Sequence, residues 1–319
     1  MSRGLFPKME TVTLARNAMA TRFELVLHGE NAGRLRAAGE EALAEVDRLE
    51  ARLSLYRPSS EIARVNAQAA RQPVRVSPPV FRLLQHAQQL HRETGGAFDI
   101  ALAPLVRCWG FMDGAGRVPG PAEIAQARQR TGFRHISLDE ADFSVRFDRE
   151  GVMIDLGAIG KGCAIDRAAD ILREAGLTSA LLHGGTSTVY GLGCPPDSEG
   201  WKVAIAQAPD GPKLQAAVVL RDNALSVSAV WARCFEAGGR KYGHVIDPRT
   251  GHPVNNSVLA AVGLPSATET DALSTALLVA GLDGHEAIAR LRPDMRTLVM
   301  AGAEQNFRTE SKGITLSGG

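Results

Sequence analysis

Apolar residues in the first half of the chain follow a two-residue period and then a helical one. Phe23, Leu25 and Leu27 alternate with polar residues, which predicts an early strand. Apolar positions then recur at helical spacing from Leu35 to Leu53, which predicts one long amphipathic helix. Three further elements are expected in this half: a helix over 79–92, a helix that begins at Pro121, and a half-buried strand over 143–147.

From Gly151 onward, strand patterns dominate and glycines mark the turns. A strand and a glycine-rich turn lead into a helix expected over 163–175, and strand patterns then continue to residue 263, with a hairpin turn at 238–239. Two helices, over 270–280 and 284–291, are expected before short terminal strands. Because helices and strands mix without regular β-α-β alternation, the pattern favours an α+β fold over a doubly wound sheet.

Composition narrows the class of protein. A chain of 319 residues with 45% hydrophobic and 22% charged residues is long and apolar enough to fold around one large core, or two smaller cores that share a cleft. Lys and Arg number 36 against 35 Asp and Glu, for a formal net charge of +1. A dedicated nucleic-acid binder would normally carry a concentrated basic surplus, so we expect no nucleic-acid partner.

The cysteines and the N-terminal segment indicate the cellular compartment in which the chain is expected. The four cysteines are far apart and form no C-x-x-C pair, so we expect reduced, mostly buried thiols. No apolar run approaches the roughly 18 residues of a transmembrane helix. The segment 1–10 is polar and contains Pro7, unlike a signal peptide. The chain as given is therefore expected in the cytoplasm, or in the periplasm or anchored to a membrane if an export leader was removed.

The chain does not match three common motifs: the Walker A loop, the dinucleotide-binding glycine pattern and the zincin zinc site. In a Walker A loop the residue five before Gly160 would be glycine and Lys161 would precede Ser or Thr, but the chain has Asp155 and Gly162. No G-x-G-x-x-G follows a predicted strand. The pair that begins at His285 has no second histidine four residues on, so a zincin site is excluded as well.

The segment Asp155–Asp166 has the pattern of an anion site. A predicted strand ends in a glycine turn that opens an apolar-periodic helix, and backbone N–H groups at such a helix start attract anions. Lys161 adds a positive charge at the same place. A structural turn with a solvated lysine fits these residues too.

The segment Ser266–Thr275 carries several oxygen-bearing side chains. Thr268 and Asp271 resemble a capping box, which would place Asp271 in a first helical turn. Ser274 and Thr275 follow three and four residues later, so the three side chains share one helix face. Hard oxygen ligands on one face suit Mg²⁺, while a well-capped helix with satisfied hydroxyls is the other interpretation.

Two more segments could contribute. His244 stands where a strand runs into a Pro/Gly turn, and a histidine there could move a proton near pH 6.5 or serve the structure only. The run Thr94–Asp99 follows a predicted helix. Its glycines indicate a C-cap turn, beyond which an aromatic residue and a carboxylate could face a site, or they simply end the helix.

Taken together, these segments resemble the ApbE family of FAD:protein FMN transferases, also described as flavin-trafficking proteins. Six blocks match in order along almost the whole chain, which is far more specific than any one of them. The blocks are Met19–Thr21; Leu53–Ile62; Gly96–Asp99 with Pro104–Val106 and Trp109–Phe111; Asp155–Gly162; His244–Gly251; and Ala267–Thr275.

The resemblance implies a fold, a reaction and a set of site residues. The fold would be α+β with a T-fold-like core and a smaller lobe, within a single domain over 1–319 whose character changes near residue 150, and the cofactor would lie between the lobes. The reaction would be Mg²⁺-dependent transfer of FMN from FAD to a Thr or Ser hydroxyl of a partner flavoprotein, with release of AMP. FAD would contact Met19, Tyr56, Ala97, Phe98, Asp99, Asp155, Lys161 and Val245, and Mg²⁺ would be held by the main-chain carbonyl of Ala158 with Asp271, Ser274 and Thr275.

His244 is our candidate for the base that deprotonates the acceptor hydroxyl. Family acceptors carry that hydroxyl in an Asp-x-x-[Ser/Thr]-Gly-Ala-[Ser/Thr] context, which this chain lacks, so self-modification is not expected. The chain departs from the family pattern at 182–187, at 226–229 and at Gly160. The alternatives are FAD binding or storage without turnover, and hydrolysis of FAD to FMN and AMP. The proposed chemistry requires that the Ala158 carbonyl oxygen and the Asp271 carboxylate lie close enough to bind the same metal ion.

Overall fold

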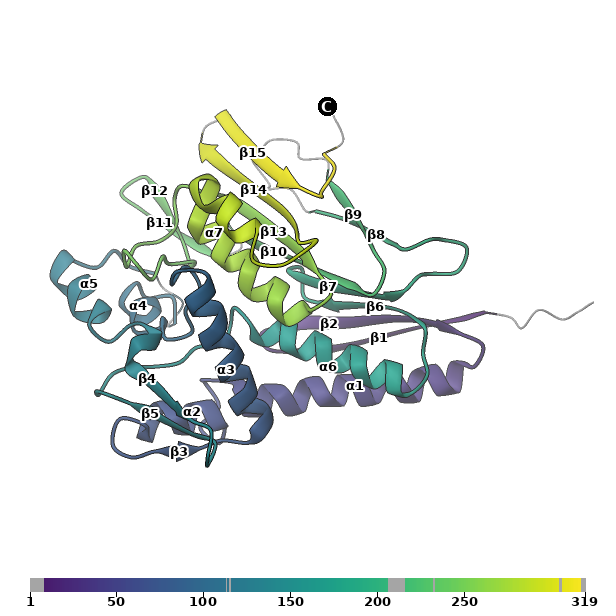
Figure 1. The fold of residues 1–319 in the computed structure, drawn as a ribbon, viewed down its shortest axis with the longest axis horizontal. Helices are drawn as coiled ribbons and strands as arrows, with labels where there is room; N and C mark the ends of the chain where they lie inside the picture. Colours follow the sequence, from purple (N-terminus) through teal and green to yellow (C-terminus); the bar gives the residue numbers. More distant parts are fainter. Residues whose placement is uncertain are drawn as a thin grey trace, which may run out of the picture.

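An eight-stranded antiparallel sheet runs through the protein (Figure 1), in the order β1-β2-β6-β7-β10-β13-β14-β15. The computed structural model describes residues 9–112, 114, 116–205, 216–231, 233–303 and 306–316. The strands are β1 (Glu10–Ala18), β2 (Thr21–Gly29), β6 (Ser179–Gly184), β7 (Thr188–Gly193), β10 (Asn223–Ala229), β13 (Leu259–Leu264), β14 (Arg296–Ala303) and β15 (Asn306–Lys312).

Three helices cover one face of this sheet: α1 (Ala32–Leu53), α6 (Gly160–Glu174) and α7 (Ala267–Ala289) (Figure 1). The apolar stripe of α1 that begins at Leu35 is buried, and so are the alternating side chains Phe23, Leu25 and Leu27 of β2. Both sequence periods therefore correspond to faces that meet in one core, and the predicted strand and long helix are confirmed.

A small hairpin covers part of the other face. Its strands are β8 (Trp201–Ala204) and β9 (Ala217–Leu220), and it packs with side chains of β7, β10, β13 and β14 in a second apolar cluster. Every residue of β13 is buried as a consequence, because both faces of that strand are covered.

A second group of elements packs beside the helix layer (Figure 1). Most of it comes from residues 61–147, and a hairpin from residues 234–243 joins it through the cluster around Trp109. Its elements are α2 (Glu61–Gln68), β3 (Val74–Arg75), α3 (Pro78–Glu93), α4 (Ala103–Cys108), α5 (Pro121–Arg128), the 3-10 helix Phe133–His135, β4 (Ile136–Asp139), β5 (Ser144–Phe147), β11 (Cys234–Ala237) and β12 (Arg240–Gly243).

The α+β class is confirmed, and one sequence expectation, that of mostly buried thiols, is wrong. The two expected C-terminal helices are both present: they meet at the non-helical residue Gly281, whose φ of 67° is left-handed, and they share the label α7. The thiols are free, but Cys234 is exposed and the other three are only half-buried, so "mostly buried" is incorrect. The expectations from sequence omit β1, although Val12 and Leu14 alternate with polar residues there, and the short helices α2 and α4, which have too few turns for a clear period.

Among the helices in the described ranges, none combines the length and the hydropathy that crossing a bilayer requires.

The crossing of α6 over α7 depends on a glycine. A Cβ on Gly162 would stand 2.1 Å from the Ala267 carbonyl oxygen, whereas a Cβ on Gly160 would meet nothing nearer than 4.0 Å. We expect Gly162→Ala to lower the free energy of unfolding by about 1–3 kcal/mol through overpacking, and Gly160→Ala to leave it unchanged or raise it slightly. Urea denaturation of both variants measures this, and equal stability of the two would contradict the close-approach argument.

Candidate functional site

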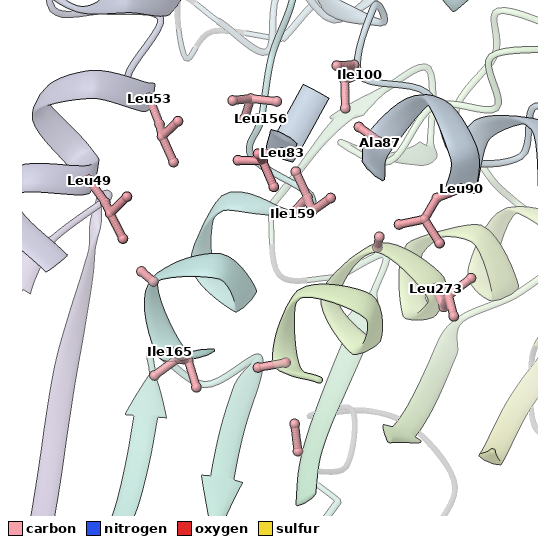
Figure 2. Close-up of a cluster of buried hydrophobic side chains, with 14 of the residues drawn as sticks. Leu49, Leu53, Leu83, Ala87, Leu90, Ile100, Leu156, Ile159, Ile165 and Leu273 are labelled. Carbon is pink, nitrogen blue, oxygen red and sulfur yellow. The ribbon is translucent and has the colours of Figure 1, made fainter. Parts of the chain in front are cut away.

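The turn that precedes α6 is held by buried apolar side chains. Leu156 and Ile159 lie in one cluster with Leu53 of α1 and Leu83 of α3 (Figure 2). Gly157, between the two anchors, is exposed. The backbone at the start of α6 is therefore fixed by the core, and the N–H groups of Ile159 and Gly160 are satisfied there by the Leu156 carbonyl.

The N-termini of α6 and α7 cap each other. Asp166 of α6 accepts hydrogen bonds from the main-chain N–H groups of Ala267 and Thr268, at 2.7 and 2.9 Å. In return, Asp271 of α7 accepts one at 3.1 Å from the N–H of Gly162. Each carboxylate thus satisfies N–H groups that have no partner within their own helix and lies at its positive end.

This arrangement corrects the predicted cap. Ser266, one residue before α7, accepts from the N–H of Glu269 at 3.2 Å, and Asp166 completes the cap from another helix. Asp271 therefore lies in the second turn of α7, not in the first. Ser266 and Glu269 also have the Ser-x-x-Glu spacing of a capping box, and α7 begins at that pair, two residues before the pair of Thr268 and Asp271.

Lys161 links the two helix starts. Its ammonium donates to the Gly157 carbonyl at 2.9 Å and lies 3.4 Å from Oδ1 of Asp271. Nearby, Asp155 accepts from the N–H of Gly157 at 2.8 Å. Burial raises the pKa of the Asp155 carboxyl above its usual value, and the Gly157 N–H and the Lys161 charge oppose that rise. The ammonium of Lys161 and the carboxyl groups of Asp155 and Asp271 therefore lie close together at this end of α6.

A chain of buried hydroxyls ends at Asp271. Thr188 on β7 lies 3.5 Å from Oδ1 of Asp271, Ser226 on β10 lies 3.2 Å from Thr188, and Thr270 lies 2.8 Å from Ser226. Because an ionised carboxylate can only accept, Thr188 must donate to it and is left free to accept from Ser226. These hydroxyls hold the carboxylate in one orientation.

Two further hydroxyls form hydrogen bonds with the main chain of Asp271. Ser274 and Thr275 donate to the main-chain carbonyl of Asp271, at 3.0 and 3.3 Å. Ser228 lies 2.9 Å from the Ser274 hydroxyl and 3.2 Å from that of Thr275. Since both hydrogens are already directed to the carbonyl, the oxygen lone pairs of Ser274 and Thr275 are the groups available to another ligand.

The donor set around Asp271 fits a hard divalent cation. In a regular helix the Gly162 N–H would bond to the carbonyl of Ala158, but it donates to Asp271, and within the described ranges the Ala158 oxygen has no hydrogen-bond partner. Carboxylate, hydroxyl and carbonyl oxygens are the ligands that Mg²⁺ takes in proteins. No cluster of three or more His, Cys, Asp or Glu able to hold a metal occurs in the described part of the chain, so side-chain acids alone do not form this site.

A cavity of about 330 Å³ opens beside the start of α6. It brings together four of the residues predicted to contact FAD: Met19, Tyr56, Asp155 and Lys161. The remaining walls come from the end of α1 and from the glycine turn. The other lining residues are Ala20, Glu50, Leu53, Ser54, Leu55, Arg57, Leu156, Gly157 and Gly160.

Ala97, Phe98 and Asp99 are not among the described residues that line this cavity. All three are buried, and Asp99 accepts from the N–H groups of Ala101 and Phe133 at 2.8 and 3.0 Å. The segment nevertheless adjoins the site, because the N–H of Asp155 donates to the carbonyl of Ile100 at 2.8 Å.

His244 follows β12 directly, and Val245 packs against the main core. Nδ1 of His244 lies 3.1 Å from the carbonyl of Arg233, which can only accept, so Nδ1 carries the hydrogen and Nε2 of the neutral ring has a free lone pair. Burial lowers the pKa of His244, and the charges of Arg233 and Lys161 lower it further. The ring is therefore neutral near pH 7, and Nε2 is the atom that can accept a proton.

The fold and this site together define a class of protein, the ApbE family, to which the chain belongs: the family profile matches residues 19–299. The chain is 33% identical over 273 residues to the FAD:protein FMN transferase of Vibrio cholerae, covering 83% of this chain and 80% of the relative. It is 32% identical over 301 residues to the FAD:protein FMN transferase of Treponema pallidum, covering 87% and 83%.

Solved structures agree with the sequence match. The flavinyl transferase ApbE of Pseudomonas stutzeri in its apo form superposes with a TM-score of 0.83 at 29% identity, covering 95% of each chain. The flavin transferase ApbE of Vibrio cholerae superposes with a TM-score of 0.84 at 26% identity, covering 95% of this chain and 97% of the other. The resemblance seen in the sequence motifs is confirmed.

Sequence reasoning did not identify the residues that position Asp271. Thr188, Ser226 and Ser228 come from strands β7 and β10, and Asp166 acts from inside α6. The available signal was the run of hydroxyl residues at 226–228, which departs from the family pattern. Its partners on α7 are more than forty positions away, so spacing alone could not connect them.

The hydroxyl chain predicts a stability effect that does not depend on any ligand. Thr188→Val keeps the shape of the side chain but removes the donor to Asp271 and leaves the Ser226 hydroxyl with a lost partner, so we expect the free energy of unfolding to fall by about 1–3 kcal/mol. Thr188→Ser should recover most of it, and Thr186→Val, at an exposed turn residue, should change it by less than about 0.5 kcal/mol. Equal stability of the two valine variants in urea denaturation would refute this.

Proposed function

We propose that this protein transfers the FMN moiety of FAD to a Thr or Ser hydroxyl of a partner flavoprotein, with Mg²⁺ as the metal and AMP as the leaving group. Membership in the ApbE family and the names of its relatives support the reaction class. The observation that carries the proposal is the position of Lys161, which lines the cavity at the start of α6 and lies 3.4 Å from the Asp271 carboxylate behind it.

In this proposal the flavin end of FAD occupies the cavity, against Met19 and Tyr56. Ala97, Phe98 and Asp99 are buried and would support this surface from the core, through the hydrogen bond between Asp155 and Ile100, and Val245 packs in the same core. The pyrophosphate lies at the N-terminus of α6, where helix N–H groups and the Lys161 ammonium attract anions, with Asp155 close by.

Mg²⁺ is held by the Asp271 carboxylate, the Ser274 and Thr275 hydroxyls and the Ala158 carbonyl. When bound, it offsets the negative charge that builds on the pyrophosphate as the bond to AMP breaks. The protein contributes the fixed orientation of these oxygens, through Thr188 for the carboxylate and Ser228 for the hydroxyls.

The transfer itself is a substitution at phosphorus. The acceptor oxygen forms a bond to the FMN phosphorus, and the bond from that phosphorus to the bridging oxygen breaks, so the bridging oxygen departs with AMP. The acceptor proton passes to Nε2 of His244, which the hydrogen bond from Nδ1 to Arg233 orients.

The direct test mixes the protein with FAD, Mg²⁺ and a purified flavoprotein subunit that carries the Asp-x-x-Thr-Gly-Ala-Thr acceptor sequence. Intact-mass spectrometry should show one FMN added per subunit, with an equal amount of AMP released. Asp271→Asn should abolish the mass gain, and Thr186→Val should not. AMP formed at the same rate without the subunit would indicate FAD hydrolysis, and tight FAD binding with no AMP would indicate storage; either result refutes the proposal.

The base assignment predicts a pH dependence. His244 must be neutral to accept the proton, and since burial lowers its pKa below 6.5, the rate should hold from pH 8 to 6.5 and fall only at lower pH. His244→Ala should lower the single-turnover rate by about 10²–10⁴-fold and remove that acid limb, with the dissociation constant for FAD nearly unchanged. A variant that keeps the wild-type pH profile would rule out His244 as the base.

A further inference from the structure

A second cavity, of about 530 Å³, lies along β12 and shares no lining residue with the first. It is bounded by α5, by β12 and by the segment 250–255. Its floor is mostly apolar, and Trp109 is fixed there because its indole N–H donates to the Gly251 carbonyl at 2.9 Å. The lining residues are Trp109, Val118, Pro119, Pro121, Ile124, Ala125, Arg128, Arg240, Lys241, Tyr242, Thr250, His252, Pro253, Val254 and Asn255.

The charges on this cavity have one sign. Arg128, Arg240 and Lys241 line it, and no Asp or Glu is among its described lining residues. Arg128 donates to the Arg249 carbonyl at 2.7 Å, so that contact leaves its charge unmatched. Glu236 stands opposite Lys241 in the hairpin, but in the described ranges neither Arg240 nor Lys241 forms an ion pair. The cavity is therefore suited to a negatively charged occupant.

The edge of β12 is also open. The β11–β12 hairpin is a two-stranded sheet, so within the described chain β12 pairs on one side only. Three consecutive residues of this strand, Arg240 to Tyr242, line the cavity. An unpaired strand edge beside an apolar groove is a place where an extended peptide can bind through main-chain hydrogen bonds.

His244 follows the β12 residues that line the second cavity, although it is not itself among the described lining residues of either cavity. It follows Gly243 at the end of β12, and Lys161, which lines the first cavity, is close enough to lower its pKa. A reaction between FAD and a protein hydroxyl needs two binding sites with the base between them. In the proposed function FAD occupies the first cavity, which leaves the second for the protein substrate.

We propose that the cationic cavity along β12 binds an acidic, extended segment of the acceptor protein and thereby presents its hydroxyl to His244. This inference rests on the proposed function and names the chemistry of its second substrate. Lys241 precedes His244 by three residues, roughly 10 Å along a strand. In the acceptor sequence that the family resemblance implies, the Asp stands three positions before a Ser or Thr hydroxyl, which matches this spacing.

The test reverses the charge of the cavity. The double variant Arg240→Glu/Lys241→Glu is compared with Arg36→Glu, a charge reversal at an exposed position of α1. With the same acceptor subunit, we expect the double variant to raise the KM for the subunit about tenfold and to weaken its salt dependence, with the KM for FAD unchanged. Arg36→Glu should leave both constants at the wild-type value.

Replacing the acidic residue of the acceptor sequence by Lys should restore binding to the double variant and weaken binding to the wild type. An unchanged KM for the subunit in the double variant overturns the inference while wild-type transfer upholds the proposed function. A raised KM for FAD alone overturns it as well, because the cavity would then serve the nucleotide. Absence of transfer by the wild type instead refutes the proposed function.

Discussion

The site depends on the mutual capping of α6 and α7. A helix start leaves N–H groups without partners and carries partial positive charge, so two helix starts brought together would be unfavourable unless carboxylates lay between them. Asp166 and Asp271 supply these carboxylates, each from the other helix. Gly162 permits the close approach, because any side chain there would collide with the Ala267 carbonyl. The contact that stabilises the helix layer is thus the same one that places Asp271 at the start of α6.

The charge pattern at this contact indicates what it is suited to bind. A free anion at the start of α6 would meet the Asp271 carboxylate, and a free cation at Asp271 would meet Lys161, only 3.4 Å away. An anion and a divalent cation that arrive together would match both charges. A pyrophosphate with a bound metal has that composition, which is why the local electrostatics support a metal-assisted nucleotide reaction more strongly than simple anion capture.

Sequence patterns predicted the parts of this structure whose signal is local. The buried faces of β2 and α1, the α6 turn and the oxygen-bearing face of α7 each follow from the spacing of a few neighbouring residues. The cap by Asp166 and the hydroxyl chain through Thr188 depend on tertiary contacts between residues 38 to 102 positions apart. No periodicity encodes such contacts. The family resemblance joined the motifs into one site, but it did not show which residues hold them in place.

The opposite wall of the first cavity shows where the fold stores strain. Met19 and Ala20 form the β1–β2 turn with φ values of 51° and 56°, a left-handed conformation that glycine or asparagine usually supplies. Such residues cost about 1–3 kcal/mol each and persist only where the surroundings hold them. Here the N–H of Met19 donates to Glu50 of α1 at 2.9 Å, and Glu50 also binds Arg57. One carboxylate therefore ties the strained turn to the end of α1, and the cavity keeps its shape between two carboxylate-held backbones, one at Met19 and one at Gly162.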